Sequence, residues 1–193
     1  MRKLTHSVIA IFSIVSFAAL ANGQQGTTIT GTAVIYGSGL STRTITRPFT
    51  MIINRRTPAE EISGYLRTLQ SGGQDALLRD LDNDDYGRFS LSGSVGIPLN
   101  AVVIDRVGGE TRIRAVFKRW IGFGELRRGL RSTDYPFGYV EINLDQTSGH
   151  GDGTFIPAAR IRFRGGDTVE VEDFGTFPGR LMGVRVRGRG NLF

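Results

Sequence analysis

The chain has 193 residues, with 24 Lys and Arg against 18 Asp and Glu, and it contains no cysteine. The lack of cysteine excludes disulfides, thiolate metal sites and a cysteine nucleophile. The modest positive charge is spread over many segments, which argues against a dedicated nucleic-acid-binding protein. A chain of this length predicts one domain that is held together by its core.

Residues 1–21 have the three parts of a secretory signal peptide: the positively charged start MRK, an apolar run over residues 8–20 and a small-x-small cleavage site that ends at Ala21. The apolar run is shorter than the roughly 20 residues that a membrane-spanning helix needs. We therefore expect cleavage after Ala21 and export of residues 22–193 as a single domain. The expected destination is the periplasm or the medium, with no membrane anchor retained.

Most of the exported part has the two-residue periodicity of β-strands. In GRFSLSGSVGI, residues 87–97, the apolar residues Phe89, Leu91, Val95 and Ile97 alternate with polar ones, which predicts one half-buried strand. Eight further strands are predicted at 27–36, 43–53, 99–107, 110–121, 137–145, 153–164, 167–174 and 180–188. About nine strands predict a mainly β domain, built as an antiparallel sandwich or barrel.

Two hairpins allow the strand register to be predicted. A two-residue turn at Gly108-Gly109 places Ile104 opposite Ile113 and Asp105 opposite Arg112. Apolar side chains then face each other, and so do side chains of opposite charge.

The second hairpin surrounds residues 164–167. A two-residue turn there would place Ile161 opposite Glu170. A three-residue loop over 164–166, with Gly166 left-handed, instead pairs Ile161 with Val169 and Arg160 with Glu170, and we therefore expect the longer loop.

One helical hairpin is predicted over about 57–84. Thr57-Pro58-Ala59-Glu60 has the pattern of a capping box with proline at the first helical position. Residues 71–74, SGGQ, end the first helix and start a second. Apolar residues of both helices fall on one face: these are Ile62, Tyr65, Leu66, Leu69, Leu77, Leu78 and Leu81. The pair is expected to lie as a lid over a sheet edge or a barrel end.

The aspartates after this helix raise the question of a calcium loop. With Asp82 at position 1, Asp84 and Gly87 occupy positions 3 and 6, but Gly93 occupies position 12, where a bidentate glutamate is needed. Starting at Asp80 also leaves the glycine and glutamate positions unfilled. We favour a polar helix exit with local turn hydrogen bonds, and Asp82 and Asp84 are the candidate ligands of the calcium alternative.

His150 is the one histidine outside the leader, and Asp145, Ser148 and Asp152 lie near it in the sequence. A general base at this position would make the protein a hydrolase. One histidine does not supply the histidine sets usual for catalytic zinc, however, and no G-x-S-x-G motif is present. We therefore interpret the segment as a solvated loop and expect no enzymatic activity and no cofactor.

Residues 117–142 contain the densest mixture of arginine and aromatic residues. Arginine and tryptophan are enriched at binding hot spots, and guanidinium groups beside aromatic rings can hold anionic or sugar-like groups. In the alternative interpretation the rings fill the core while the arginines extend into solvent. The candidate ligand-binding residues are Arg119, Trp120, Arg127, Arg128, Arg131 and Tyr135.

Three stretches carry a resemblance: GRFSLSG, RWIGFGELRRGLRSTDYPFGYVEI and GDGTFIPAARIRF. In these the chain resembles small exported bacterial β-rich proteins of similar length to which no function is assigned. The resemblance implies a single mostly β domain, and it implies no activity, cofactor or catalytic residue.

The function expected from the sequence is that of an exported, non-enzymatic β domain that binds a ligand, polymer or partner protein. We expect a monomer or a weak oligomer that does not bind nucleic acid. One alternative is a small outer-membrane β-barrel, although Arg185, Arg187 and Arg189 occupy positions that should face lipid in such a barrel. The second alternative is a hydrolase centred on His150.

Overall fold

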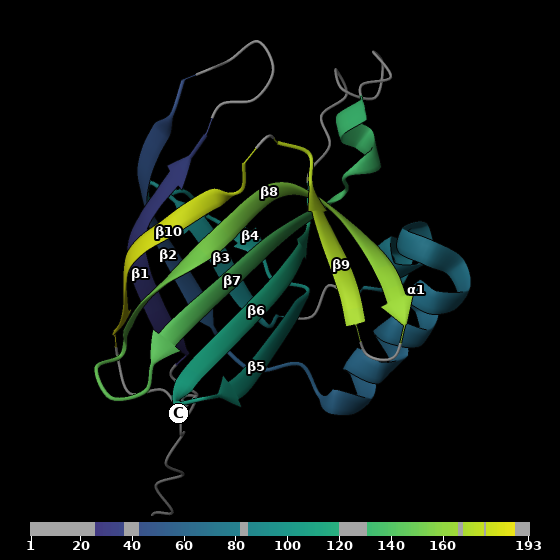
Figure 1. The fold of residues 1–193 in the computed structure, drawn as a ribbon, viewed down its shortest axis with the longest axis horizontal. Coiled ribbons are helices and arrows are strands. Elements are labelled where there is room, and N and C mark those ends of the chain that lie inside the picture. Colours follow the sequence, from purple (N-terminus) through teal and green to yellow (C-terminus); the bar gives the residue numbers. More distant parts are fainter. Residues whose placement is uncertain are drawn as a thin grey trace, which may run out of the picture.

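The computed structural model describes residues 26–36, 43–81, 85–119, 131–165, 168–175 and 177–187. Over these residues the chain forms ten strands and one helix, which confirms the prediction of a mainly β fold (Figure 1). The helix, α1 (Ala59–Asp80), lies between β2 and β3 in the sequence. The strands are β1 (Thr27–Ile35), β2 (Ile45–Ile53), β3 (Gly87–Leu91), β4 (Ile97–Pro98), β5 (Ala101–Val107), β6 (Glu110–Lys118), β7 (Phe137–Asp145), β8 (His150–Gly165), β9 (Thr168–Asp173) and β10 (Gly179–Arg187).

All ten strands belong to one antiparallel sheet in the order β4-β3-β2-β1-β10-β8-β7-β6-β5, with β9 beside β8. The sheet is not closed as a barrel, and it curves so that its two halves face each other like the layers of a sandwich (Figure 1). The two ends of this order meet where β4 passes into β5. There the Leu99 N–H donates to the Gly87 carbonyl of the β3 side, and the Asn100 N–H donates to Val116 of β6.

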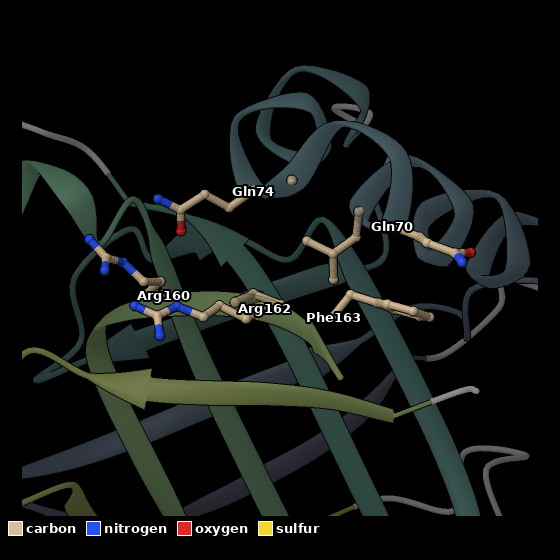
Figure 2. Close-up of a pocket in the computed structure, with 8 residues that line it drawn as sticks. Gln70, Gln74, Arg160, Arg162 and Phe163 are labelled. Carbon is tan, nitrogen blue, oxygen red and sulfur yellow. The ribbon is translucent and has the colours of Figure 1, made fainter. Parts of the chain in front are cut away.

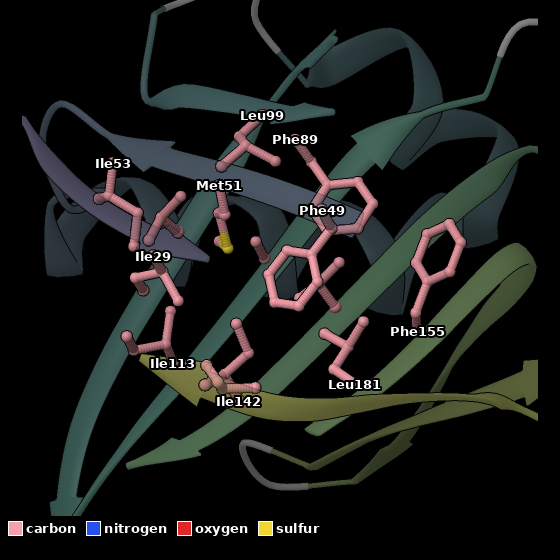
Figure 3. Close-up of a cluster of buried hydrophobic side chains, with 14 of the residues drawn as sticks. Ile29, Phe49, Met51, Ile53, Phe89, Leu99, Ile113, Ile142, Phe155 and Leu181 are labelled. Carbon is pink, nitrogen blue, oxygen red and sulfur yellow. The ribbon is translucent and has the colours of Figure 1, made fainter. Parts of the chain in front are cut away.

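A cluster of phenylalanine rings fills the space between the two layers (Figure 3). The Phe89 ring lies with its centroid 5.7 Å from that of Phe49, 6.3 Å from that of Phe117 and 4.9 Å from that of Phe155. These rings come from β3, β2, β6 and β8, so one cluster joins strands that are far apart in the sheet order. The position beside this cluster, Gly138, has no room for a side chain, because an ideal Cβ there would lie 2.0 Å from the Phe117 ring.

A second apolar cluster lies on the outer face of the sheet, under α1. Val116, Tyr139 and Ile156 belong to it, whereas their chain neighbours Phe117, Val140 and Phe155 belong to the inner cluster. Leu69, Leu77 and Leu81 from the helical segment complete this second cluster with Phe137 and Ile161. The helix therefore covers the outer face near β8 and β9 (Figure 1), rather than a barrel end.

The helix begins differently from the predicted capping box. Pro58 is at the N-cap position and no side chain caps the helix. Thr57 instead binds β5, because its Oγ1 accepts the Val102 N–H at 2.8 Å and its own N–H donates to the Val102 carbonyl at 2.8 Å. The capping-box prediction is wrong because the Thr57 hydroxyl accepts a hydrogen bond from a strand that is distant in sequence, and not from the first turn of the helix.

The break predicted within the helical segment is confirmed. Gly73 has φ +69° and ψ −168°, which interrupts the helix between its two parts. The Thr68 hydroxyl donates to Asp80 Oδ2 at 2.7 Å and links the two parts.

The predicted register of the β5–β6 hairpin is confirmed, with Ile104 opposite Ile113 and Asp105 opposite Arg112. The register of the β8–β9 hairpin is wrong by two residues, since Ile161 lies opposite Val171. β8 continues to Gly165, which lies opposite Thr168, so the chain reverses later than predicted. Together with a bulge between Phe163 and Gly165, this moves the partners by two residues and preserves the alternation of faces.

Residues 87–97 are a hairpin and not the single strand predicted. Ser92, Gly93 and Gly96 have positive φ angles and turn the chain, so that Phe89 of β3 lies opposite Ile97 of β4. As a result Phe89 is buried, whereas Val95 is 84% exposed. Alternating hydrophobicity continued through this turn, which is why nine strands were predicted where ten are described.

Among the described residues, no helix is both long enough and apolar enough to cross a bilayer.

Replacing Phe89 by alanine should remove the centre of the ring cluster. We expect the free energy of unfolding to fall by about 3–5 kcal/mol, as for other buried phenylalanines, measured by urea denaturation. Val95→Ala is the control, because Val95 is 84% exposed, and its effect should stay within about 0.5 kcal/mol. Equal effects of the two substitutions would contradict the role assigned to Phe89.

Candidate functional site

Of the six candidate ligand-binding residues, Arg119 and Tyr135 are the two whose side chains the structure describes. Trp120, Arg127 and Arg128 lie outside the described residues, and Arg131 is described only as the start of a 3₁₀ turn, Arg131–Asp134. The candidate binding surface built on all six residues therefore stays a prediction.

Arg119 holds the 3₁₀ turn before β7. Its Nε donates to the Tyr135 carbonyl at 3.1 Å, and its Nη2 donates to the Ser132 carbonyl at 2.8 Å. Its backbone N–H also donates to the Pro136 carbonyl. The guanidinium group thus binds two carbonyls of the turn, of which that of Ser132 also accepts the Tyr135 N–H at 3.1 Å.

Tyr135 joins the same turn to β9. The residue is buried, and its hydroxyl donates to Glu172 at 2.5 Å. The Arg160 guanidinium lies 4.8 Å from the centre of the Tyr135 ring, and the Phe174 ring meets that ring edge-on. Tyr135 therefore packs inside the protein.

The loop around His150 is an ordered turn. Asp145 Oδ1 accepts hydrogen bonds from the N–H groups of Thr147 and Ser148 and from the Ser148 hydroxyl. The bonds from Ser148 hold the pKa of Asp145 below its usual range. The Ser148 hydroxyl thus donates to the carboxylate and accepts the His150 backbone N–H, whereas an activated nucleophile would donate to the imidazole.

Asp82 and Asp84, the candidate calcium ligands, lie outside the described residues. Within the described part of the chain, no group of three or more His, Asp or Glu side chains is arranged to hold a metal ion.

One pocket, of about 440 Å³, lies between the break in α1 and the second half of β8. Figure 2 shows the guanidinium groups of Arg160 and Arg162 beside the Gln74 amide. Both arginines already have carboxylate partners, Asp134 at 3.3 Å and Glu172 at 3.1 Å. Their charge is therefore compensated inside the protein.

A larger groove, of about 610 Å³, lies on the outer face over β7, β8 and β10, and we call it the aromatic groove. Tyr36 and Phe177 line it, with ring centroids 6.3 Å apart in an edge-to-face arrangement. These rings are exposed, Tyr36 at 37% and Phe177 at 66%. The other lining residues are Asn143, Asp152, Gly153, Thr154, Pro178, Gly179 and Arg180.

Strand alternation positions the polar groups of the aromatic groove. Leu181 and Phe155 are buried in the inner cluster, so their neighbours Arg180 and Thr154 project from the opposite face. The β8–β10 register places Arg180 opposite Thr154, and the β7–β8 register places Asn143 opposite Asp152. The polar floor of the groove thus stands on three hydrogen-bonded strands.

The groove combines exposed rings with hydrogen-bonding groups of several kinds. Arg112 Nε donates to Asn143 Oδ1 at 3.2 Å, which fixes the orientation of that amide. Thr154 can donate or accept, Asp152 accepts, and Arg180 donates. Such a set suits a ligand that has both apolar faces and hydroxyl or charged groups.

The sequence reasoning missed the aromatic groove. Its residues come from four separate parts of the chain, and no motif joins them. The available signal was the position of Tyr36 and Phe177 next to glycine or proline at strand ends, where a large apolar residue is poorly placed to be buried.

No family model, curated protein or solved structure was found to match the chain.

Replacing Arg119 by alanine should destabilise the fold, because two carbonyl groups would lose a charged donor. We expect a loss of about 1–3 kcal/mol in the free energy of unfolding. Arg106→Ala is the matched control, since Arg106 is an exposed arginine on β5, and it should change stability by less than about 0.5 kcal/mol. Denaturation curves that coincide for the two variants would rule out the structural role of Arg119.

Proposed function

We propose that the protein is an exported, non-catalytic domain that binds a saccharide chain in the aromatic groove. The observation that carries the proposal is the pair of exposed rings, Tyr36 and Phe177, beside a polar groove floor. Export rests on the signal-peptide pattern of residues 1–21.

A saccharide matches the chemistry of this groove. Sugar rings present C–H faces that can cover aromatic side chains, and their edges carry hydroxyl groups that donate and accept hydrogen bonds. Covering a ring such as that of Phe177, which is 66% exposed, lowers the free energy of the complex because apolar surface is removed from water. Asp152, Asn143 and Thr154 offer the complementary hydrogen-bonding groups on the floor.

The arrangement supports binding better than hydrolysis. Cleavage of a glycosidic bond usually needs two carboxyl groups that flank it. Of the residues described as lining the groove, Asp152 alone carries a carboxyl group. A floor carried on hydrogen-bonded strands is also preorganised, which lowers the entropic cost of binding.

The double substitution Tyr36→Ala/Phe177→Ala should abolish the apolar contact and leave the core intact, because both rings are exposed. Affinity gel electrophoresis through dextran, dextran sulfate or polygalacturonate measures the binding. We expect at least one polymer to retard the wild-type protein. The double variant should bind that polymer with an affinity lower by about tenfold or more. Val95→Ala, which removes an exposed apolar side chain elsewhere, should bind as the wild type does.

Two results would contradict the proposal. One is migration of the wild-type protein that none of the three polymers changes. The other is equal retardation of the wild type and the Tyr36→Ala/Phe177→Ala variant.

A further inference from the structure

Charge is distributed unequally between the two halves of the sheet. Strands β1, β2, β3, β4 and β10 contain no aspartate or glutamate. The same strands carry five arginines: Arg47, Arg88, Arg180, Arg185 and Arg187. The ion pairs given by the structure, by contrast, involve acids of β5, β9 and the turn before β7.

Three of these arginines form a row along the outer face of β10. Val186 lies opposite Ile29, a core residue, so the side chains of Arg185 and Arg187 project from the outer face. Arg180 projects from the same face, because Leu181 beside it is buried in the core. We call Arg180, Arg185 and Arg187 the arginine row, and all three residues are exposed.

Hydroxyl groups accompany the arginine row on the neighbouring strands. Arg185 lies opposite Thr30 and Arg187 lies opposite Thr28 on β1. Thr30 in turn lies opposite Thr50 on β2. The face beside the row is thus rich in small donors and acceptors, with no carboxylate on β1 or β2.

The charges of the arginine row are not compensated within the described part of the protein. No described carboxylate lies within ion-pair distance of any of its three guanidinium groups. Like charges on one strand repel each other, and an anionic ligand would relieve that repulsion. Guanidinium groups suit this role because they bind carboxylate or sulfate oxygens with two parallel hydrogen bonds.

The row continues from the aromatic groove, because Arg180 belongs to both. We propose that the saccharide chain is anionic and that its carboxylate or sulfate groups lie along the arginine row while one of its sugar rings covers Tyr36 and Phe177. This inference rests on the proposed function and adds the charge of the ligand and its direction along β10.

The placement of the exposed rings favours an anionic saccharide over a nucleic acid. Proteins that bind single-stranded nucleic acid stack successive bases on successive aromatic rings. The exposed rings described beside the row are Tyr36 and Phe177, which contact each other at one end of it.

The test compares dextran with dextran sulfate, which share a backbone and differ in charge. We expect the wild-type protein to bind dextran sulfate or polygalacturonate more tightly than dextran, with an affinity that falls as salt is raised. Arg185→Gln/Arg187→Gln should weaken binding to the charged polymer by about tenfold and leave binding to dextran unchanged. Preference between the two charged polymers distinguishes sulfate from carboxylate as the recognised group.

The control is Arg79→Gln/Arg106→Gln, which removes the same charge from exposed arginines on α1 and β5. It should bind as the wild type does. Equal losses in the two double variants would overturn the inference. So would wild-type binding of dextran sulfate and of polygalacturonate that is no tighter than its binding of dextran. Tighter binding of oligo(dT) than of either charged polymer would also overturn it.

The variants separate this inference from the proposal on which it rests. If Tyr36→Ala/Phe177→Ala weakens binding while Arg185→Gln/Arg187→Gln does not, the groove binds the saccharide and the arginine row has no part in it. If the arginine variant alone weakens binding, the proposal of a saccharide held in the groove is overturned.

Discussion

The contact of Phe89 with Phe49, Phe117 and Phe155 brings together strands that the sheet order keeps apart. Without disulfides, the curved sheet depends on such contacts to hold its two halves face to face. The same packing determines the outer surface, because each side chain directed inward commits its neighbour to the other face. Arg180 and Thr154 line the aromatic groove for this reason.

The outer face of the sheet is divided into two parts with different roles. Near β8 and β9 it is apolar and α1 covers it, with Leu69 and Leu77 as buried contacts. Over β10 and β1 it carries the arginine row and the threonines beside it, and the aromatic groove lies between the two parts. In the covered part Arg160 and Arg162 pair with acids of the same domain, whereas no described acid pairs with the arginine row.

Local periodicity was sufficient to predict most strands and the β5–β6 register, because these depend on residues close together in the chain. The errors arose where a residue distant in sequence or an unusual backbone conformation decided the structure. The Thr57 hydroxyl accepts a hydrogen bond from Val102 and therefore does not cap the helix. Positive φ angles turn the chain within an alternating pattern. The candidate binding site was harder to predict. Arginine and aromatic density pointed to 117–142, where Arg119 and Tyr135 serve the fold, while the groove is assembled from separate strands.

Rings from opposite halves of the sheet meet in one core, and this contact sets which residues face outward. Nuclear Overhauser effects between ring protons of selectively labelled phenylalanines test it most directly. We expect cross-peaks from the Phe89 ring to the rings of both Phe117 and Phe155. A cross-peak from the Phe89 ring to the ring of Phe49 on β2 alone would contradict it.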